Sequence, residues 1–306
     1  MAADLTVTIA GVTLKNPVMS ASGTFGNGRE YEDLIDLTRL GALVTKGVSA
    51  VPWEGNPTPR IAETPAGMLN AIGLQNPGID VFIEREMPFL AALRGKGTRI
   101  IVNVCGHSVE EYLTVIDRLR DQPVDLLEIN VSCPNVREGA IAFGQDPVML
   151  KEVTEACKEH AAQPIIMKLT PNVTDIRVLA RAAEEGGADA ISLINTLTGM
   201  KIDVEKRRFL LANRTGGLSG PAIHPVAVRM VYEASHAVSI PVIGMGGIAS
   251  GTDAVEMMLA GAAAVAVGTM TFHEPGAMVR IIDEIAAYAE RHGIRQIREL
   301  TGAVQG

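Results

Sequence analysis

The chain has 306 residues, 47% of them hydrophobic, which is enough to bury a large core. Its 35 acidic and 27 basic side chains give a net charge of −8, which argues against nucleic acid or an anionic membrane as the main partner. The three cysteines, Cys105, Cys133 and Cys157, lie far apart in the sequence, so we expect neither a disulfide framework nor a metal site. The N-terminus lacks a basic region followed by an apolar core, so we expect no signal peptide and a cytoplasmic protein.

The chain begins with two alternating runs between Leu5 and Leu14, on either side of Ala10-Gly11, which predicts a β-hairpin. After Asn16-Pro17 come short apolar segments, each followed by polar residues or glycine and then by a helical pattern. The predicted strands are Val18–Ser20, Leu43–Lys46, Ile100–Val104, Leu126–Val131, Ile165–Leu169, Ala190–Ile194, Val242–Met245 and Ala264–Val267. The predicted helices are Tyr31–Leu40, Val109–Arg120, Pro147–Ala161, Val173–Gly186, Ile223–Ala237, Ser250–Ala260 and Gly276–His292.

Eight strands alternating with helices predict an α/β protein, a (β/α)8 barrel, with a doubly wound open sheet as the weaker alternative. No linker or low-complexity stretch divides the sequence, so we expect a single domain over residues 1–306. Two connections are long, Val48 to Arg99 and Leu197 to Pro221. Long loops inside a compact domain are commonly lids or binding loops, so both are candidates for the functional site.

In a barrel the site is built at the carboxyl ends of the strands, and these ends are polar or glycine throughout. They carry Ala21-Ser22-Gly23, Thr45-Lys46-Gly47, Asn103, Asn130, Cys133, Lys168, Asn195-Thr196, Gly244–Gly247 and Gly268-Thr269. Gly246-Gly247 and Gly268-Thr269 follow the seventh and eighth strands, where barrels bind phosphate through backbone N–H groups. A glycine can also end a strand for steric reasons alone. The two sets together favour a phosphate-bearing ligand.

The lysines and asparagines at these ends suggest what kind of ligand it is. Lys46 and Lys168 lie among apolar residues, and a lysine is rarely buried without an anion, although both could extend to the surface. A flavin is one ligand that would suit such lysines, because a fixed positive charge beside its ring stabilises the anionic reduced form. Asn70, Asn130 and Asn195 offer donors and acceptors to a planar, amide-rich ring, while turn and cap chemistry is the alternative.

Cys133 is the candidate reactive residue. It follows the predicted strand Leu126–Val131, and Pro134 biases it toward an extended or turn conformation at the strand's end. This is where a nucleophile or general base lies in a parallel α/β fold. The competing interpretation is that Cys133 is a small buried hydrophobic residue, as free cysteines commonly are.

With these residues in view, the chain resembles the soluble dihydroorotate dehydrogenases over essentially its whole length. Four motifs carry the resemblance: Asn130-Val-Ser-Cys-Pro-Asn135, Asn70-Ala-Ile-Gly-Leu-Gln-Asn76, Thr45-Lys-Gly47 and Gly244-Met-Gly-Gly-Ile248. The second has Gln75 where fumarate-linked homodimers tend to carry proline, and so is similar to the NAD-linked branch called class 1B. A serine in place of Cys133 would have suggested the membrane-bound, quinone-linked class.

The resemblance implies one FMN per chain, lying across the barrel mouth with its phosphate at Gly246, Gly247, Gly268 and Thr269. It implies contacts to the ring and ribityl chain from Ser22, Lys46, Gly47, Asn103, Asn130, Lys168, Ile194 and Gly220. Dihydroorotate would stack on the flavin, held by Lys46, Asn70, Ala71, Ile72, Gly73, Leu74, Asn130, Asn195 and Thr196. Cys133 would take the C5 proton while hydride passes from C6 to flavin N5, giving orotate for pyrimidine biosynthesis. Residues 138–146 would form a lid over Cys133, or else an ordinary surface loop.

The chain itself carries neither a cysteine set for an iron–sulfur cluster nor Gly-x-Gly-x-x-Gly after a strand for NAD. The class 1B resemblance implies a partner subunit with FAD and a [2Fe–2S] cluster that passes electrons to NAD. The assembly would be a heterotetramer built on a homodimer of this chain, with no membrane or nucleic acid involved. A fumarate-linked homodimer or a related FMN-dependent dihydropyrimidine dehydrogenase stays open. A barrel that only binds a phosphorylated ligand needs neither Cys133 nor Lys46, which argues against it.

Overall fold

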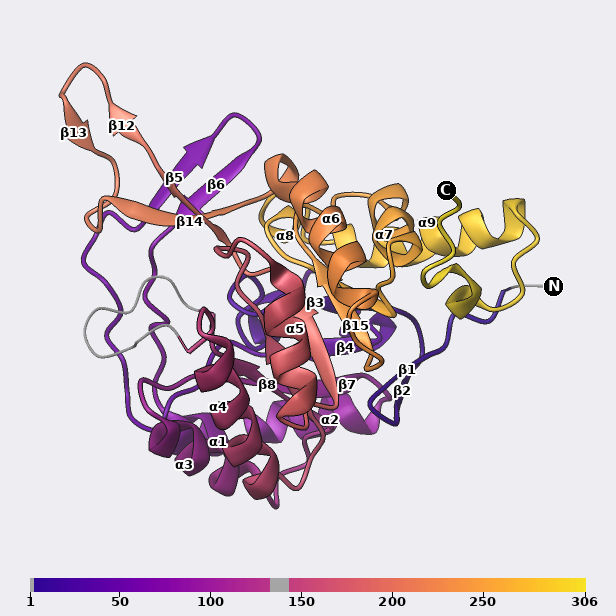
Figure 1. The fold of residues 1–306 in the computed structure, drawn as a ribbon, viewed down its shortest axis with the longest axis horizontal. Helices are drawn as coiled ribbons and strands as arrows, with labels where there is room; N and C mark the ends of the chain where they lie inside the picture. The colour runs from indigo at the N-terminus through magenta and orange to yellow at the C-terminus, as the bar shows by residue number, and fades with distance from the viewer. Residues whose placement is uncertain (1–2, 133–142) are drawn as a thin grey trace.

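The computed structural model describes residues 3–132 and 143–306, and within them eight parallel strands close into a barrel (Figure 1). In order around the barrel these are β3 (Val18–Ser20), β4 (Ala42–Val44), β7 (Arg99–Val104), β8 (Leu126–Asn130), β9 (Ile165–Lys168), β10 (Ala190–Leu193), β15 (Val242–Met245) and β16 (Ala264–Val267). The barrel closes where β16 pairs with β3, with Val267 opposite Ser20. The predicted (β/α)8 barrel is therefore confirmed, and the open sheet is wrong.

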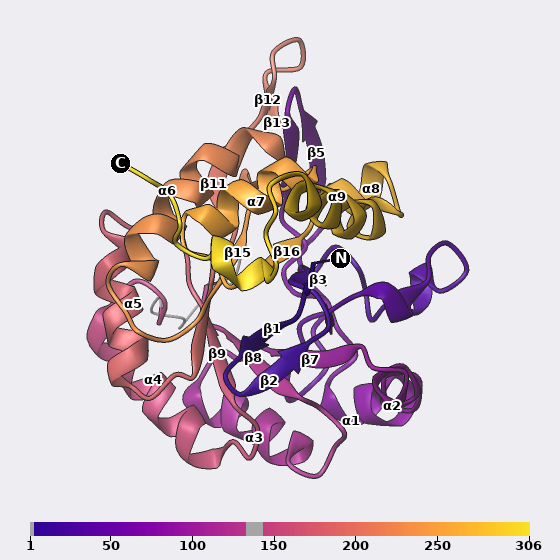
Figure 2. The same cartoon turned by 90° about the vertical axis from the view of Figure 1, so that its right-hand side faces the viewer.

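Helices surround the barrel as an outer ring (Figure 2). The main ones are α3 (Val109–Leu119), α4 (Pro147–His160), α5 (Ile176–Glu185), α6 (His224–Ser235), α7 (Gly251–Leu259) and α9 (Ala277–Arg291). Their starts are fixed by side-chain caps, since Asp146, Asp175 and Ser250 each accept a backbone N–H of the first turn. All six correspond to predicted helices, with ends that differ by up to three residues.

One predicted helix is wrong. Over Tyr31–Leu40 the structure has only two short 3₁₀ turns, η1 (Arg29–Tyr31) and η2 (Leu37–Arg39). Asp36 is in an extended conformation and accepts the backbone N–H of Thr38, so it starts a new turn instead of continuing a helix. A short polar side chain that bonds its own backbone therefore outweighs the helical pattern here.

The first long connection contains two unpredicted helices, α1 (Ile79–Arg85) and α2 (Met87–Gly95), and a further short helix, α8 (Met270–His273), follows β16. The two long connections also pair with each other in an antiparallel sheet of order β11-β14-β6-β5. Its strands are β5 (Ile61–Thr64), β6 (Gly67–Asn70), β11 (Leu197–Met200) and β14 (Thr215–Ser219). A hairpin of β12 (Ile202–Asp203) and β13 (Arg208–Phe209) projects from this sheet (Figure 1). Parts of both predicted binding loops thus form one arm, made of this sheet and its hairpin.

The predicted N-terminal hairpin is present as β1 (Val7–Ile9) and β2 (Val12–Leu14). Ala10 and Gly11 have φ of 49° and 81°, and two residues with positive φ are what a tight hairpin turn requires. The Thr13 carbonyl accepts a hydrogen bond of 2.9 Å from Nε of Arg99, the first residue of β7, so the hairpin lies at the amino-terminal end of the barrel. No helix within the described residues has the length and apolar composition needed to cross a membrane.

Candidate active site

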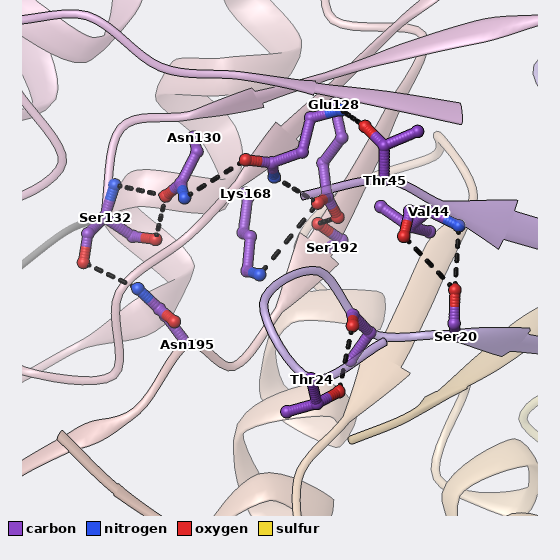
Figure 3. A network of polar contacts seen from close by, with 12 residues as sticks. Ser20, Thr24, Val44, Thr45, Glu128, Asn130, Ser132, Lys168, Ser192 and Asn195 are labelled. Atoms are coloured by element: carbon purple, nitrogen blue, oxygen red, sulfur yellow. Dashed lines mark hydrogen bonds and ion pairs between the residues drawn. The ribbon is translucent and has the colours of Figure 1, made fainter. Parts of the chain in front are cut away.

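A buried carboxylate, Glu128 of β8, lies at the centre of a polar network inside the barrel (Figure 3). Asn103 Nδ2 donates to its Oε2 at 2.6 Å and Ser192 Oγ donates to its Oε1 at 2.7 Å. Lys168 Nζ lies 3.9 Å from Oε2, with the two side chains only 5% and 3% exposed. These residues come from β7, β8, β9 and β10, which are neighbours in the barrel, so the parallel register brings them together. The network joins two predicted site residues, Asn103 and Lys168, to a carboxylate.

The network continues to the residue directly before Cys133. Asn130 Nδ2 approaches Asn103 Oδ1 at 3.5 Å, while Asn130 Oδ1 accepts from Ser132 N at 3.3 Å and from Ser132 Oγ at 2.8 Å. Asn195 Nδ2 donates to the Ser132 carbonyl at 2.8 Å (Figure 3). The predicted general base Cys133 and most of the predicted lid lie outside the described residues. The backbone leading to Cys133 is thus held by two of the predicted asparagines.

A second group of predicted residues lies at the ends of β15 and β16. Gly246 and Gly247 have φ of 133° and 69°, a region that favours glycine. A Cβ added to Gly247 would lie 2.8 Å from the Gly220 carbonyl oxygen, and one on Gly246 would lie 3.4 Å from Ile194 Cγ1. A Cβ on Gly268 would lie 3.5 Å from Ala21 Cβ, beside the loop that carries Ser22. The structure therefore brings the predicted phosphate-binding glycines close to Gly220, Ile194 and the loop after β3.

The backbone donors of this group are free to bind a ligand. In the part of the chain that the structure describes, no protein acceptor takes a hydrogen bond from the N–H groups of Gly246, Gly247, Gly268 or Thr269. The Thr269 hydroxyl donates to Ser219 Oγ at 2.7 Å. His224 Nδ1 lies 2.8 Å from the Gly246 carbonyl oxygen, and because that oxygen only accepts, Nδ1 is the donor. Backbone amides at the start of a turn and helix form a suitable anion site.

The remaining predicted residues lie between the barrel and the arm. A Cβ on Gly47 would lie 3.0 Å from Asn103 Oδ1 and 3.3 Å from Leu74 Cδ2, so the second and third strand ends meet the loop after β6. Asn70 Nδ2 donates to the Gly217 carbonyl at 3.4 Å, and Thr196 packs against Gly217. Ala71, Ile72, Gly73 and Leu74 follow Asn70 in this loop. The arm therefore brings the predicted substrate residues to the barrel mouth.

The expectation that both lysines are buried is correct only for Lys168. Lys46 is half-buried, and its backbone N–H donates to the Gly26 carbonyl at 2.8 Å. Lys168 also has an anion from the protein itself, Glu128, which the sequence analysis missed. The sequence does contain an indication that Glu128 belongs to the site. Glu128 and Asn130 are two residues apart and so point to the same face of β8.

A family model described as dihydroorotate dehydrogenase matches residues 4–288. The chain belongs to the dihydroorotate dehydrogenase family. Among curated relatives in this family, a protein of Lachnoclostridium phytofermentans is 60% identical over 98% of this chain and 99% of its own. A second, from Alkaliphilus metalliredigens, is 58% identical over 98% of this chain and 99% of its own. Both are named dihydroorotate dehydrogenase B (NAD(+)), catalytic subunit.

A solved structure of a dihydroorotate dehydrogenase from Eimeria tenella, in complex with ferulenol, has the same fold. It superposes with a TM-score of 0.83 at 24% identity, over 98% of this chain and 88% of its own. The family's barrel is thus shared at low identity. In this member of the dihydroorotate dehydrogenase family, the Glu128 network and the glycine group lie at the same end of that barrel, where barrel enzymes carry their active sites.

Proposed function

We propose that this chain is the catalytic subunit of an NAD-linked dihydroorotate dehydrogenase, which oxidises dihydroorotate to orotate in pyrimidine biosynthesis. The observation that carries the proposal is the buried network of Glu128, Lys168, Asn103 and Asn130, which ends at Ser132, next to Cys133. A site that only binds a phosphorylated ligand has no use for a buried ion pair and a chain of oriented amides. The names of the relatives support the same activity and the NAD-linked branch.

FMN fits the donor groups at the barrel mouth. The N–H groups of Gly246, Gly247, Gly268 and Thr269 suit a phosphate, because no described protein acceptor uses them. The ammonium of Lys168 and the amides of Asn103 and Asn130 suit the polar edge of the ring. The other residues proposed to contact the ring and ribityl chain are Ser22, Lys46, Gly47, Ile194 and Gly220. When bound, one FMN per chain supplies the hydride acceptor.

The substrate is proposed to bind between the flavin and the arm. Lys46 supplies a positive charge for a carboxylate, and the amides of Asn130 and Asn195 offer donors and acceptors to the dihydropyrimidine ring. Asn70, Ala71, Ile72, Gly73, Leu74 and Thr196 complete the proposed set. The Sγ atom of Cys133 takes the proton from C5. Asn130 and Asn195 hold the backbone of Ser132, so they also position the residue that follows it.

The electrons must leave this chain, and we propose that a partner subunit with FAD and a [2Fe–2S] cluster passes them to NAD. The relatives' names describe a catalytic subunit, which implies a separate partner. We propose a heterotetramer built on a homodimer of this chain, in the cytoplasm. Sequence features for iron–sulfur or NAD binding are absent from this chain, so the route to NAD needs the second protein.

The experiment is an anaerobic titration of the purified chain with dihydroorotate, followed at the flavin absorption band. We expect a yellow protein whose band bleaches, and reoxidation by NAD only when the partner subunit is added. Reoxidation by fumarate without a partner would favour the fumarate-linked alternative. A yellow protein that does not bleach would move the substrate to another reduced pyrimidine, and a colourless protein would contradict the flavoenzyme assignment.

A further inference from the structure

Glu128 is a carboxylate for which the proposed reaction has no direct use. It is 2% exposed, and both of its oxygens accept hydrogen bonds from residues on neighbouring strands, Asn103 and Ser192. Burying a carboxylate is expensive unless it is paired and hydrogen-bonded, and here it is both. An apolar residue of similar size would avoid this cost, so the charge of Glu128 calls for an explanation in the site.

We propose that Glu128 is a positioning residue that keeps Lys168 charged and sets the direction of the amide chain from Asn103 to Ser132. The inference rests on the proposed function, because it assigns Glu128 to the FMN and substrate site. In this role Glu128 does not itself touch the ligands. It determines how three proposed ligand-binding side chains, Asn103, Asn130 and Lys168, present their polar atoms.

Glu128 first affects the charge of Lys168. Lys168 is 4% exposed, and Glu128 is its ion-pair partner among the described residues. An ammonium this deeply buried is held in its charged form by a nearby anion, because transfer of an isolated charge from water costs far more than a hydrogen bond returns. At 3.9 Å the pair is too long for a hydrogen bond, so the three N–H donors of Lys168 are not used by Glu128.

Glu128 also determines the orientation of the amides. A carboxylate only accepts, so Asn103 must turn its Nδ2 toward Glu128 and its Oδ1 toward Asn130. Asn130 must then present Nδ2 to Asn103, which leaves its Oδ1 for Ser132. Flipping either amide would place two acceptors or two donors against each other. The negative charge of Glu128 therefore fixes the donor and acceptor pattern of the chain up to Ser132.

The substitution Glu128→Gln distinguishes an effect of the charge of this side chain from an effect of its volume. Glutamine has a similar volume and can still accept from Ser192, but it has no charge and its Nε2 can donate to a flipped Asn103. The matched control is Asp125→Asn, which neutralises another buried carboxylate directly before the same strand, where it pairs with Arg94 and Arg99. The two changes have the same chemistry, one directly before β8 and the other in the middle of the strand.

The experiment compares wild type, Glu128→Gln, Lys168→Gln, the combined variant and Asp125→Asn as purified holoproteins. Three quantities are measured: the dissociation constant of FMN, the flavin reduction potential against reference dyes, and the folded fraction by circular dichroism. We expect Glu128→Gln to raise the FMN dissociation constant roughly tenfold or more, as for loss of a charged hydrogen-bond partner. We also expect it to lower the potential, as Lys168→Gln does, because reduction adds negative charge to the ring.

The combined variant should have the same potential as Glu128→Gln, because in both variants the side chains at positions 128 and 168 carry no charge. Asp125→Asn should leave the dissociation constant and the potential at wild-type values. Wild-type values in Glu128→Gln would overturn the proposal. A potential that rises would also overturn it, because Lys168 would then keep its charge without Glu128.

If Glu128→Gln does not fold, Glu128→Asp carries the test, because it keeps the charge but withdraws it by one methylene from Asn103 and Lys168. We expect a weaker FMN affinity and a potential between those of wild type and Lys168→Gln, and wild-type values would overturn the proposal. These measurements need no dihydroorotate. A wild-type protein that does not bind FMN or is not bleached by dihydroorotate would instead contradict the proposed function.

Discussion

The two ends of the barrel use the same residue types in different ways. At the amino-terminal end, Asp125 and Asp189 directly precede β8 and β10. Asp125 Oδ2 accepts the N–H of Ile100 at 2.9 Å, and Asp189 Oδ2 accepts that of Ile165 at 2.8 Å. Each carboxylate thus fixes the start of a neighbouring strand, and each also pairs with basic side chains at the surface.

The difference lies in the exposure of the cations. Arg94 and Lys158, which pair with Asp125 and Asp189, have side chains 39% and 41% exposed, while Lys168, which pairs with Glu128, has one that is 5% exposed. A half-exposed cation can turn to water, so its ion pair contributes to stability alone. A buried cation cannot, so its anion controls both its charge and its direction. The exposure of the cation therefore separates the Glu128–Lys168 pair from the two ion pairs at the amino-terminal end.

The largest effect is expected from Cys133→Ala, which removes the proposed general base. Flavin reduction by dihydroorotate should slow by roughly a hundredfold or more, as for loss of a general base, while FMN stays bound. Anaerobic stopped-flow measurement of the flavin band provides the rate. Cys157→Ala, which removes a cysteine on α4, is the control and should reduce at the wild-type rate. An undiminished rate in Cys133→Ala would remove this residue from the mechanism.

A pair of lysine variants tests the comparison directly. Lys168→Met should weaken FMN binding by about tenfold or more, because it removes a buried charge at the proposed flavin site. Lys158→Met removes a half-exposed lysine that contacts Asp189 at the other end, and should leave FMN binding unchanged. Equilibrium binding followed by flavin fluorescence measures both. Equal effects of the two variants would mean that the ends of the barrel are not functionally distinct.

Asp125→Asn should change the stability of the fold and not FMN binding or flavin reduction. It weakens the contacts with Arg94 and Arg99 and with the N–H of Ile100, which should lower the free energy of unfolding by about 1–3 kcal/mol. Urea unfolding measures the loss, and the rate of flavin reduction should not change. If the rate fell while stability stayed the same, the assignment of the amino-terminal end to stability would be wrong.

The smallest effect is expected at Cys157, on the barrel-facing side of α4. Burial raises the pKa of its thiol from about 9 to about 12, so about one molecule in ten thousand is a thiolate at pH 8. Iodoacetamide should therefore leave Cys157 unmodified in the native protein, as peptide mass analysis would reveal. Between pH 9 and 12 the unfolded thiol ionises and the folded one does not, so this group lowers stability as the pH rises. Rapid alkylation of Cys157 at pH 8 would contradict the burial.

Much of the barrel could be predicted because buried parallel strands are apolar on both faces. The ranges of β3, β15 and β16 were predicted without error, and the other strands differ by one or two residues at an end. The helices α1 and α2 were missed inside a connection interpreted as a loop. The single domain stays a prediction. The role of Cys133 also stays a prediction, because this residue lies outside the described residues.

The candidate site could be predicted as a set of strand ends but not as a network. Asn103, Asn130 and Lys168 were found because each is polar at the end of an apolar run. Glu128 was missed because it lies inside such a run, where one charge does not disturb the apolar pattern. Its importance depends on register, which places Asn103 opposite Glu128 and Lys168 opposite Asn130 across three strands. Sequence periodicity within one strand contains no information about that alignment.

The closure of the barrel between β16 and β3 has a consequence for synthesis. Val267 pairs with Ser20, so roughly 250 residues and, at about 5–20 residues per second, on the order of ten to fifty seconds separate the two partners on the ribosome. During this interval the nascent sheet has two open edges, β3 and β15, each able to pair with another chain. Ribosomal pausing before Ala264 would extend the exposure. The speed of translation between these two strands therefore determines how long both edges stay unpaired.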